Sequence, residues 1–285
     1  MVVFGIVAAA TVQIIVRQER FYASMSDITS MRGSLRDAVG VLPVDLREIS
    51  SAGGDIYAMS DSAIDFRASV GIAVVCSIPT STTIIIPPTS LVSRSGVTTW
   101  LTAPGAGDTA FVYNDGTSPA TSDDSWFKVA LAAAPVTGVC PTSSSFTSNA
   151  TEAAAAYTLT VSPALPSTVM VGSLIRFYRR VKYKLFQPTA GGAWYLGYMD
   201  CPGGVCGSMA AVAGPFLAYS STPSATGLRF VYRDTTGAVT ADPTKVARID
   251  ITARARTDNI IRISGRPPDY YADSLVLSVA LRNRS

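Results

Sequence analysis

The pattern of hydrophobic and polar positions changes twice along the chain. Residues 1–16 contain no charged side chain, and the next four are Arg17, Gln18, Glu19 and Arg20. From there to Ile49 apolar residues recur at helical spacing, whereas after Asp55 they mostly alternate with polar ones. Periods of 3.6 and 2 residues are typical of helix and strand, respectively. The sequence therefore predicts an α+β fold, in which a long N-terminal helix, the stem (residues 1–50), packs on a mostly antiparallel β-sheet region, the head (residues 51–285).

The uncharged N-terminal run favours a helix that enters a membrane. It is shorter than the about 20 apolar residues of a usual spanning helix, but Arg17 and Arg20 at its end could reach lipid headgroups. A secretory signal would begin with basic residues. A helix of the protein interior is the alternative, but an uncharged run followed at once by Arg17 and Arg20 suits a membrane boundary better. Small residues also allow close helix approach in lipid. The predicted membrane and assembly residues are Phe4, Gly5, Ile6, Ala8, Ala9, Val12, Ile15 and Val16.

The second part of the stem carries an apolar stripe. Ile28, Leu35, Leu42 and Ile49 recur every seven residues, and Val39 and Leu46 form a neighbouring line. Such spacing keeps one apolar seam along a helix, so we expect these six residues to form the seam between stem and head. Pro43 should kink or restart the helix. Residues 51–54, Ser-Ala-Gly-Gly, should end it.

The head reads as strands separated by turn residues. Residues 141–156 are of low complexity and predict a surface loop or a short helix. The predicted strands are residues 55–59, 63–68, 71–78, 82–86, 109–114, 126–132, 157–161, 174–187, 193–200, 228–233, 246–256 and 275–282.

Four cysteines allow two kinds of cross-link. An even number of cysteines in a β-rich chain behind an export-type segment favours two disulfides. Cys201 with Cys206 would close a tight loop, and Cys76 with Cys140 a long one. A four-thiolate zinc site is the alternative, but such sites use closely spaced pairs of cysteines. Cys76 and Cys140 do not form such a pair.

The composition argues against catalysis. The chain has no histidine, which removes the commonest general base and metal ligand, and we find no catalytic group of residues and no cofactor motif. Asp108 with Asp115, and Asp123 with Asp124, could hold calcium, although loop aspartates are more often turn formers. With 15% charged residues and a net charge of +3, no strong field attracts nucleic acid. The residues that could still bind single-stranded DNA are Tyr178, Arg179, Arg180, Lys182, Tyr183, Lys184 and Phe186.

Segments at both ends of the chain resemble a known family. MVVFGIVAAATV followed by RQERFY is similar to the N-terminal helix of type IV pilins and type II secretion pseudopilins. Residues 181–185, 227–237 and 246–251 resemble strand ends of the larger minor pilins, of the PilW-like and J-type pseudopilin kind. In that family a short leader ends in glycine, and a Phe-Thr-Leu-Ile-Glu-Leu-like run begins the helix. Neither is present here, so we expect Met1 to be an internal methionine with the motif encoded upstream.

The resemblance implies a structural subunit rather than an enzyme. Such a subunit would assemble through its N-terminal helix into a type IV pilus or a type II secretion pseudopilus, in initiation or at the tip. Its partners would be other pilin or pseudopilin subunits and the inner-membrane assembly machinery. It would cross the bacterial inner membrane once, with its head in the periplasm or on a surface filament. The alternatives are an anchored β domain that binds a surface ligand, as an adhesin does, and a secreted hydrolase.

Overall fold

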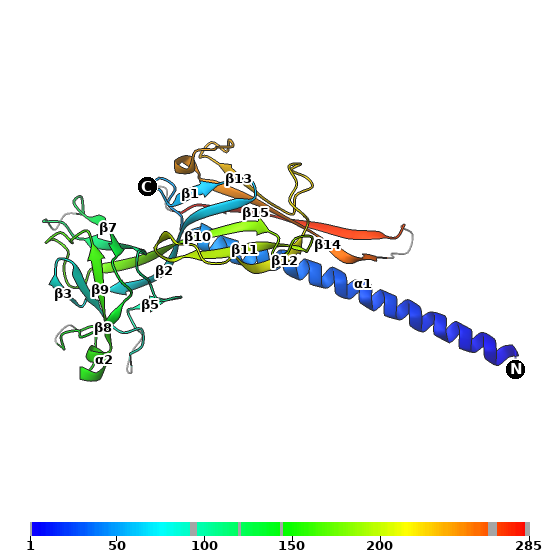
Figure 1. Cartoon of the computed structure of the whole chain (residues 1–285), viewed down its shortest axis with the longest axis horizontal. Helices are drawn as coiled ribbons and strands as arrows, with labels where there is room; N and C mark the ends of the chain where they lie inside the picture. The colour runs from blue at the N-terminus through cyan, green and yellow to red at the C-terminus, as the bar shows by residue number, and fades with distance from the viewer. Residues whose placement is uncertain (1, 92–95, 119–120, 143–144, 262–266, 283–285) are drawn as a thin grey trace. The chain divides into compact units, whose positions relative to one another are not determined.

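The computed structural model describes residues 2–91, 96–118, 121–142, 145–261 and 267–282, with side chains from residue 7 onward. The chain folds into two compact units (Figure 1). Unit 1 contains Met1–Ile64, Tyr183–Tyr198 and Met209–Ser285, and unit 2 contains Asp65–Lys182 and Met199–Ser208. The predicted stem belongs to unit 1. The chain passes from one unit to the other within three of its strands.

The long helix α1 spans Val2–Leu46 and has Pro43 in its last turn. The helix continues past this proline for three residues, since only the hydrogen bond that the Pro43 nitrogen would donate is lost. The Arg47 N–H still donates to the carbonyl of Pro43. Beyond the helix the Ser50 N–H donates to Asp55 at 2.7 Å, and Gly54 takes a positive φ of 70°. Helix α1 ends at Leu46, so Ile49, the last residue of the predicted seam, lies three residues beyond the helix.

Unit 1 combines α1 with antiparallel strands. Strands β13, β14 and β15 form a three-stranded sheet in that order, and β11 pairs with β12. The later part of α1 packs against β12, β14 and β15. Alternating positions of β14 are buried, among them Ile249, Ile251 and Ala253, as expected of a sheet with one covered face. The elements are β1 (Ile56–Met59), β11 (Trp194–Cys201), β12 (Ala210–Phe216), β13 (Leu228–Arg233), η2 (Pro243–Lys245), β14 (Arg248–Ile261) and β15 (Asp269–Ala280).

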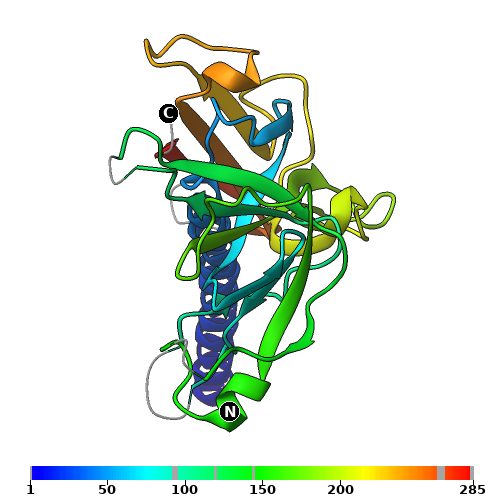
Figure 2. The same ribbon diagram turned by 90° about the vertical axis from the view of Figure 1, so that its left-hand side faces the viewer.

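Unit 2 is built on a path of mostly antiparallel strands in the order β2-β10-β6-β7-β9-β4-β3, with β5 on β2 and β8 on β9. Its core contains Val112, Leu131, Ile175 and Phe177. The short helix α2, green in Figure 2, leads into β9. The elements are β2 (Ala63–Val74), β3 (Ser77–Thr80), β4 (Thr83–Ile86), β5 (Thr99–Trp100), β6 (Thr109–Asn114), β7 (Ser125–Leu131), β8 (Val136–Gly138), α2 (Ala150–Ala154), β9 (Ala156–Ser162), β10 (Leu174–Phe186) and η1 (Pro202–Gly204).

Both predicted disulfides are present. Cys76 is bonded to Cys140, and Cys201 to Cys206. Because these bonds use all four cysteines, the alternative of a four-thiolate zinc site is wrong. Cys76 and Cys140 are buried together with Ala156 in a small core of unit 2.

The α+β prediction, with a long N-terminal helix and a mostly antiparallel sheet, is confirmed. The predicted strands at residues 63–68 and 71–78 are instead one continuous strand, β2, which ends at Val74, and β3 begins at Ser77. Strands β5, β8 and β12 were not predicted. They are short, or rich in alanine and glycine, so they show little alternation of apolar and polar residues.

Candidate assembly surface

The first half of the described α1 side chains is uncovered. Val7, Val12, Ile14 and Ile15 are 58%, 59%, 57% and 49% exposed, and in the figure this part of the helix extends beyond the strands of unit 1 (Figure 1). Successive helical residues are rotated by about 100°, so Val12, Ile14 and Ile15 point in different directions. We call residues 7–25 the uncovered segment. Its residues 7–16 present apolar side chains in several directions around the helix, and the charged cluster of residues 17–20 follows them.

Such a segment is unfavourable in water. A helix that is hydrophobic all round is usually buried in protein or lipid, because exposed apolar surface costs about 25 cal/mol for each Å². Phe21 and Tyr22 extend the exposed surface, at 61% and 70%. The described part of the chain leaves this apolar surface uncovered.

The predicted membrane and assembly residues fall on or beside this segment. Ala8, Ala9, Val12 and Ile15 are exposed, and Val16 is partly buried. Phe4, Gly5 and Ile6 belong to α1, but their side chains lie outside the described residues.

Among the residues that the structure describes, no helix is both long enough and apolar enough to cross a membrane.

The later half of α1, the packed segment (residues 26–46), is a core element of unit 1. Of the predicted seam, Leu35, Leu42, Leu46 and Ile49 are buried, and Ile28 and Val39 are partly buried. Met31, where the apolar stripe continues towards the N-terminus, is also buried there, and so are Ser34 and Ala38, which were not predicted to lie in the seam. Met31 lies four residues before Leu35 and Ala38 three residues after it, so both fall on the face of the helix that the stripe marks.

Polar contacts add to this apolar packing at its exposed margin. Arg32 donates to Asp273 at 3.1 Å and to the Tyr271 hydroxyl at 2.9 Å. Its guanidinium also lies 5.6 Å from the centre of the Tyr271 ring. Nearer the uncovered segment, Asn259 donates to Asp27 at 2.8 Å. These contacts fix the direction of α1 on β14 and β15 where the helix leaves the sheet.

A more buried polar contact lies at the end of α1. The Tyr183 hydroxyl donates to Asp45 at 2.7 Å, and the Tyr183 side chain is 2% exposed. Burial raises the pKa of Asp45, because a charged carboxylate loses hydration, and the hydrogen bond from Tyr183 partly offsets this rise. Burial, together with the neighbouring Asp45, also raises the pKa of Tyr183. This pair joins α1 to β10 within unit 1.

The candidate calcium ligands do not come together. Asp108 forms a buried ion pair with Arg179 at 2.7 Å, while Asp123 accepts the backbone N–H groups of Thr117 and Ser118 at 2.8 and 3.0 Å. Asp124 accepts the Tyr113 hydroxyl at 2.6 Å, and Asp115 is exposed in the turn after β6. No group of three or more acidic or cysteine side chains in the described ranges is placed to hold a metal ion.

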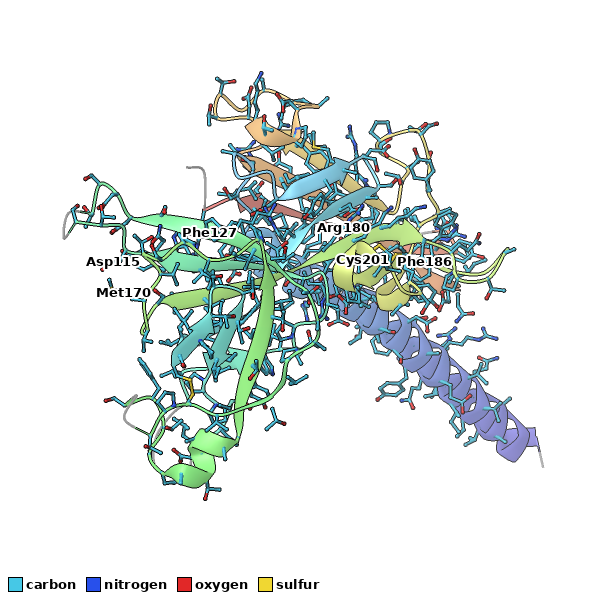
Figure 3. All side chains as sticks on the ribbon, turned by 60° about the vertical axis from the view of Figure 1, so that its left-hand side comes forward. Asp115, Phe127, Met170, Arg180, Phe186 and Cys201 are labelled. Carbon is cyan, nitrogen blue, oxygen red and sulfur yellow. A yellow bond between two sulfur atoms is a disulfide. The ribbon has the colours of Figure 1, made fainter. Side chains whose placement is uncertain are left out.

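The Arg179 network is structural in character. Arg179 also contacts Asp200 at 3.0 Å and the Ala103 carbonyl at 2.9 Å. Burial disfavours the charged form of Arg179 and so lowers its pKa. The hydrogen bonds and negative charges of Asp108 and Asp200 have a larger combined effect, and the pKa of Arg179 is raised. Asp200 directly precedes Cys201, which Figure 3 labels. The network thus ties β10 to the disulfide loop within unit 2.

The predicted DNA-binding residues do not form one surface. Arg179 and Tyr183 are buried, whereas Arg180, labelled on β10 in Figure 3, pairs with Asp65 at 2.7 Å. The reason is that successive strand residues point to opposite faces. The predicted set contains both odd-numbered positions of β10, which are buried, and even-numbered positions, which reach the surface.

Comparison with known proteins identifies no relative: no protein-family model, no curated protein and no solved structure matches the chain.

Proposed function

We propose that this protein is a non-enzymatic structural subunit that assembles through α1 into a pilin-type filament, as minor pilins and pseudopilins do. One observation carries the proposal. A single helix is uncovered and apolar over residues 7–15 but packed into unit 1 from Met31 to Leu46. That arrangement suits a subunit whose packed segment holds the helix to its own fold while the uncovered segment meets other helices.

The occupant that we propose for the uncovered segment is the corresponding helix of neighbouring subunits. Ala8, Ala9 and Ala10 are consecutive small residues, and small residues let helix backbones approach closely where lipid removes the usual hydrophobic driving force. Before assembly the same segment would hold the subunit in the bacterial inner membrane, with the head in the periplasm. Arg17 and Arg20 would then lie at the headgroups.

The test is the double substitution Gly5→Leu with Ala9→Leu, expressed in the native bacterium. We expect the double variant to be missing from the sheared filament fraction, because the larger side chains keep neighbouring helices apart. Its unfolding midpoint should match that of the unchanged protein, since Ala9 is exposed and does not pack on the sheet.

The control is Ala52→Leu, which changes an exposed alanine beyond the end of α1. This variant should enter the filament fraction as the unchanged protein does. If the double variant is incorporated normally, helix-to-helix packing through these residues is not the mechanism of assembly.

A further inference from the structure

A second feature lies on the outer face of the unit 2 sheet, away from its core. The strand register places Phe111 of β6 between Arg176 of β10 and Lys128 of β7. Two residues further along β6, on the same face, Tyr113 lies opposite Trp126 of β7. Their neighbours in sequence, Val112, Ile175 and Val129, are buried in the core. The aromatic and basic side chains therefore share the solvent face of these three strands, which we call the aromatic–basic face.

The aromatic–basic face is built by mutual contacts. The Arg176 guanidinium lies 4.5 Å from the centre of the Trp126 ring, and Tyr113 packs edge-on to Trp126 at 5.6 Å. Phe111 likewise packs edge-on to Tyr178 at 5.5 Å. Stacking on an aromatic ring orients a guanidinium while leaving its N–H edge free to bind an anion. Arg176 is thus held ready for a ligand rather than free to rotate.

Two cations on this face have no acidic partner. Arg176 and Lys128 are exposed, and within the described ranges neither forms an ion pair. By contrast, Arg180 on the same strand is paired with Asp65. Arg176 and Lys128 are two strand spacings apart, roughly 10 Å. Trp126, two residues before Lys128 on β7, remains 38% exposed. The face therefore offers two separated positive charges beside an accessible ring.

The surroundings include carboxylates and neutral hydrogen-bonding groups. Asp124 accepts the Tyr113 hydroxyl, and the Asn114 side chain donates to the Ser125 hydroxyl at 3.3 Å. The hydrogen bond to Asp124 is the main reason that the pKa of Tyr113 rises to about 12, so Tyr113 stays protonated at neutral pH. These carboxylates can accept hydrogen bonds from sugar hydroxyls, whereas the phosphate backbone of single-stranded DNA offers them no donor.

From this combination we propose that the aromatic–basic face binds an acidic polysaccharide. Trp126 and Tyr113 pack against the apolar face of a sugar ring, as amphipathic aromatic side chains can. Arg176 and Lys128 bind carboxylates on the glycan, and the polar groups at the strand ends meet its hydroxyls. This inference is independent of the assembly function, because it concerns unit 2 alone.

The experiment is a calorimetric titration of the full-length protein at low salt with three probes: alginate, a polymer of uronic acids; neutral dextran; and single-stranded oligothymidine. We expect alginate to bind most tightly and its affinity to fall as salt is raised. Equal binding of dextran would overturn the role of the two cations. Tighter binding of oligothymidine would assign the face to nucleic acid instead, and no binding of any probe would also overturn the proposal.

Variants connect the binding to the named residues. Arg176→Gln combined with Lys128→Gln should weaken alginate binding about tenfold or more, since hydrogen bonds to charged groups are among the stronger polar contacts. Lys184→Gln, which removes an exposed lysine of the same strand, is the matched control and should bind alginate normally. Thermal unfolding checks that each variant folds. If the double variant does not fold, the single change at exposed Lys128 must still weaken binding, and an unchanged affinity would overturn the proposal.

Discussion

The two halves of α1 both carry large apolar side chains, but these side chains have opposite surroundings. Leu42 and Leu46 in the packed segment are fully buried, whereas Ile14 and Ile15 in the uncovered segment are 57% and 49% exposed. Side-chain hydrophobicity does not explain the difference, because isoleucine and leucine are equally suited to a core. What differs is the pattern. The packed segment carries charged residues beside its apolar stripe, whereas residues 7–16 of the uncovered segment include no charged side chain.

That difference shows where each half obtains its stability. The packed segment gains from burial against β12, β14 and β15. Most side chains of the uncovered segment, by contrast, are exposed, and isolated helices of about 12–15 residues are marginal in water. Its helical form is thus propagated from the packed segment. Substitutions that are matched in chemistry but placed in opposite halves should therefore have very different effects.

The largest contrast should come from truncating one apolar side chain in each half. Leu42→Ala should lower the free energy of unfolding by about 2–5 kcal/mol, because it leaves a cavity in a core position that is 0% exposed. Val12→Ala, at a position 59% exposed, should change it by less than about 0.5 kcal/mol. Urea denaturation followed by circular dichroism measures both. Similar losses at the two sites would mean that the halves do not differ in packing.

The sequence predicted much of this comparison because hydrophobic period is a local property. Leu35, Leu42 and Leu46 could be placed in the seam from their spacing, and strands at residues 109–114 and 228–233 have the predicted limits. Ala38 was missed because a small residue gives little periodic signal. The partners of the seam could not be predicted, since the Asp45–Tyr183 contact joins residues 138 positions apart. Sheet register likewise decides that Arg176 meets Trp126, and register is not visible in a single strand.

A medium effect is expected where the packed segment ends. Tyr183→Phe removes the hydroxyl that donates to Asp45 at 2.7 Å, which leaves a partly buried carboxylate without this donor. We expect a loss of about 1–2 kcal/mol in the free energy of unfolding at neutral pH. Tyr22→Phe is the control from the uncovered segment, because its side chain is 70% exposed, and it should leave that free energy unchanged. A Tyr183→Phe variant as stable as the unchanged protein would show that this hydrogen bond does not help to hold α1 on its unit.

The smallest effect should appear in the pH dependence of the same contact. Burial raises the pKa of Asp45 above its ordinary value, so in the folded state this carboxyl binds its proton more tightly than in the unfolded chain. Its contribution to stability is therefore greatest below the ordinary carboxyl pKa and falls as the pH rises through the folded-state pKa. Asp45→Asn keeps an acceptor for Tyr183 but cannot ionise. The unfolding midpoint of this variant, measured from pH 3 to pH 7, should rise relative to that of the unchanged protein as the pH increases.

Asp37→Asn, at an exposed position of the same segment, serves as the control and should show no such trend. The difference in unfolding midpoint between Asp45→Asn and the unchanged protein could instead be constant with pH, or shrink towards neutrality. Either result would mean that Asp45 does not lie in the desolvated environment that distinguishes the packed segment from the uncovered one.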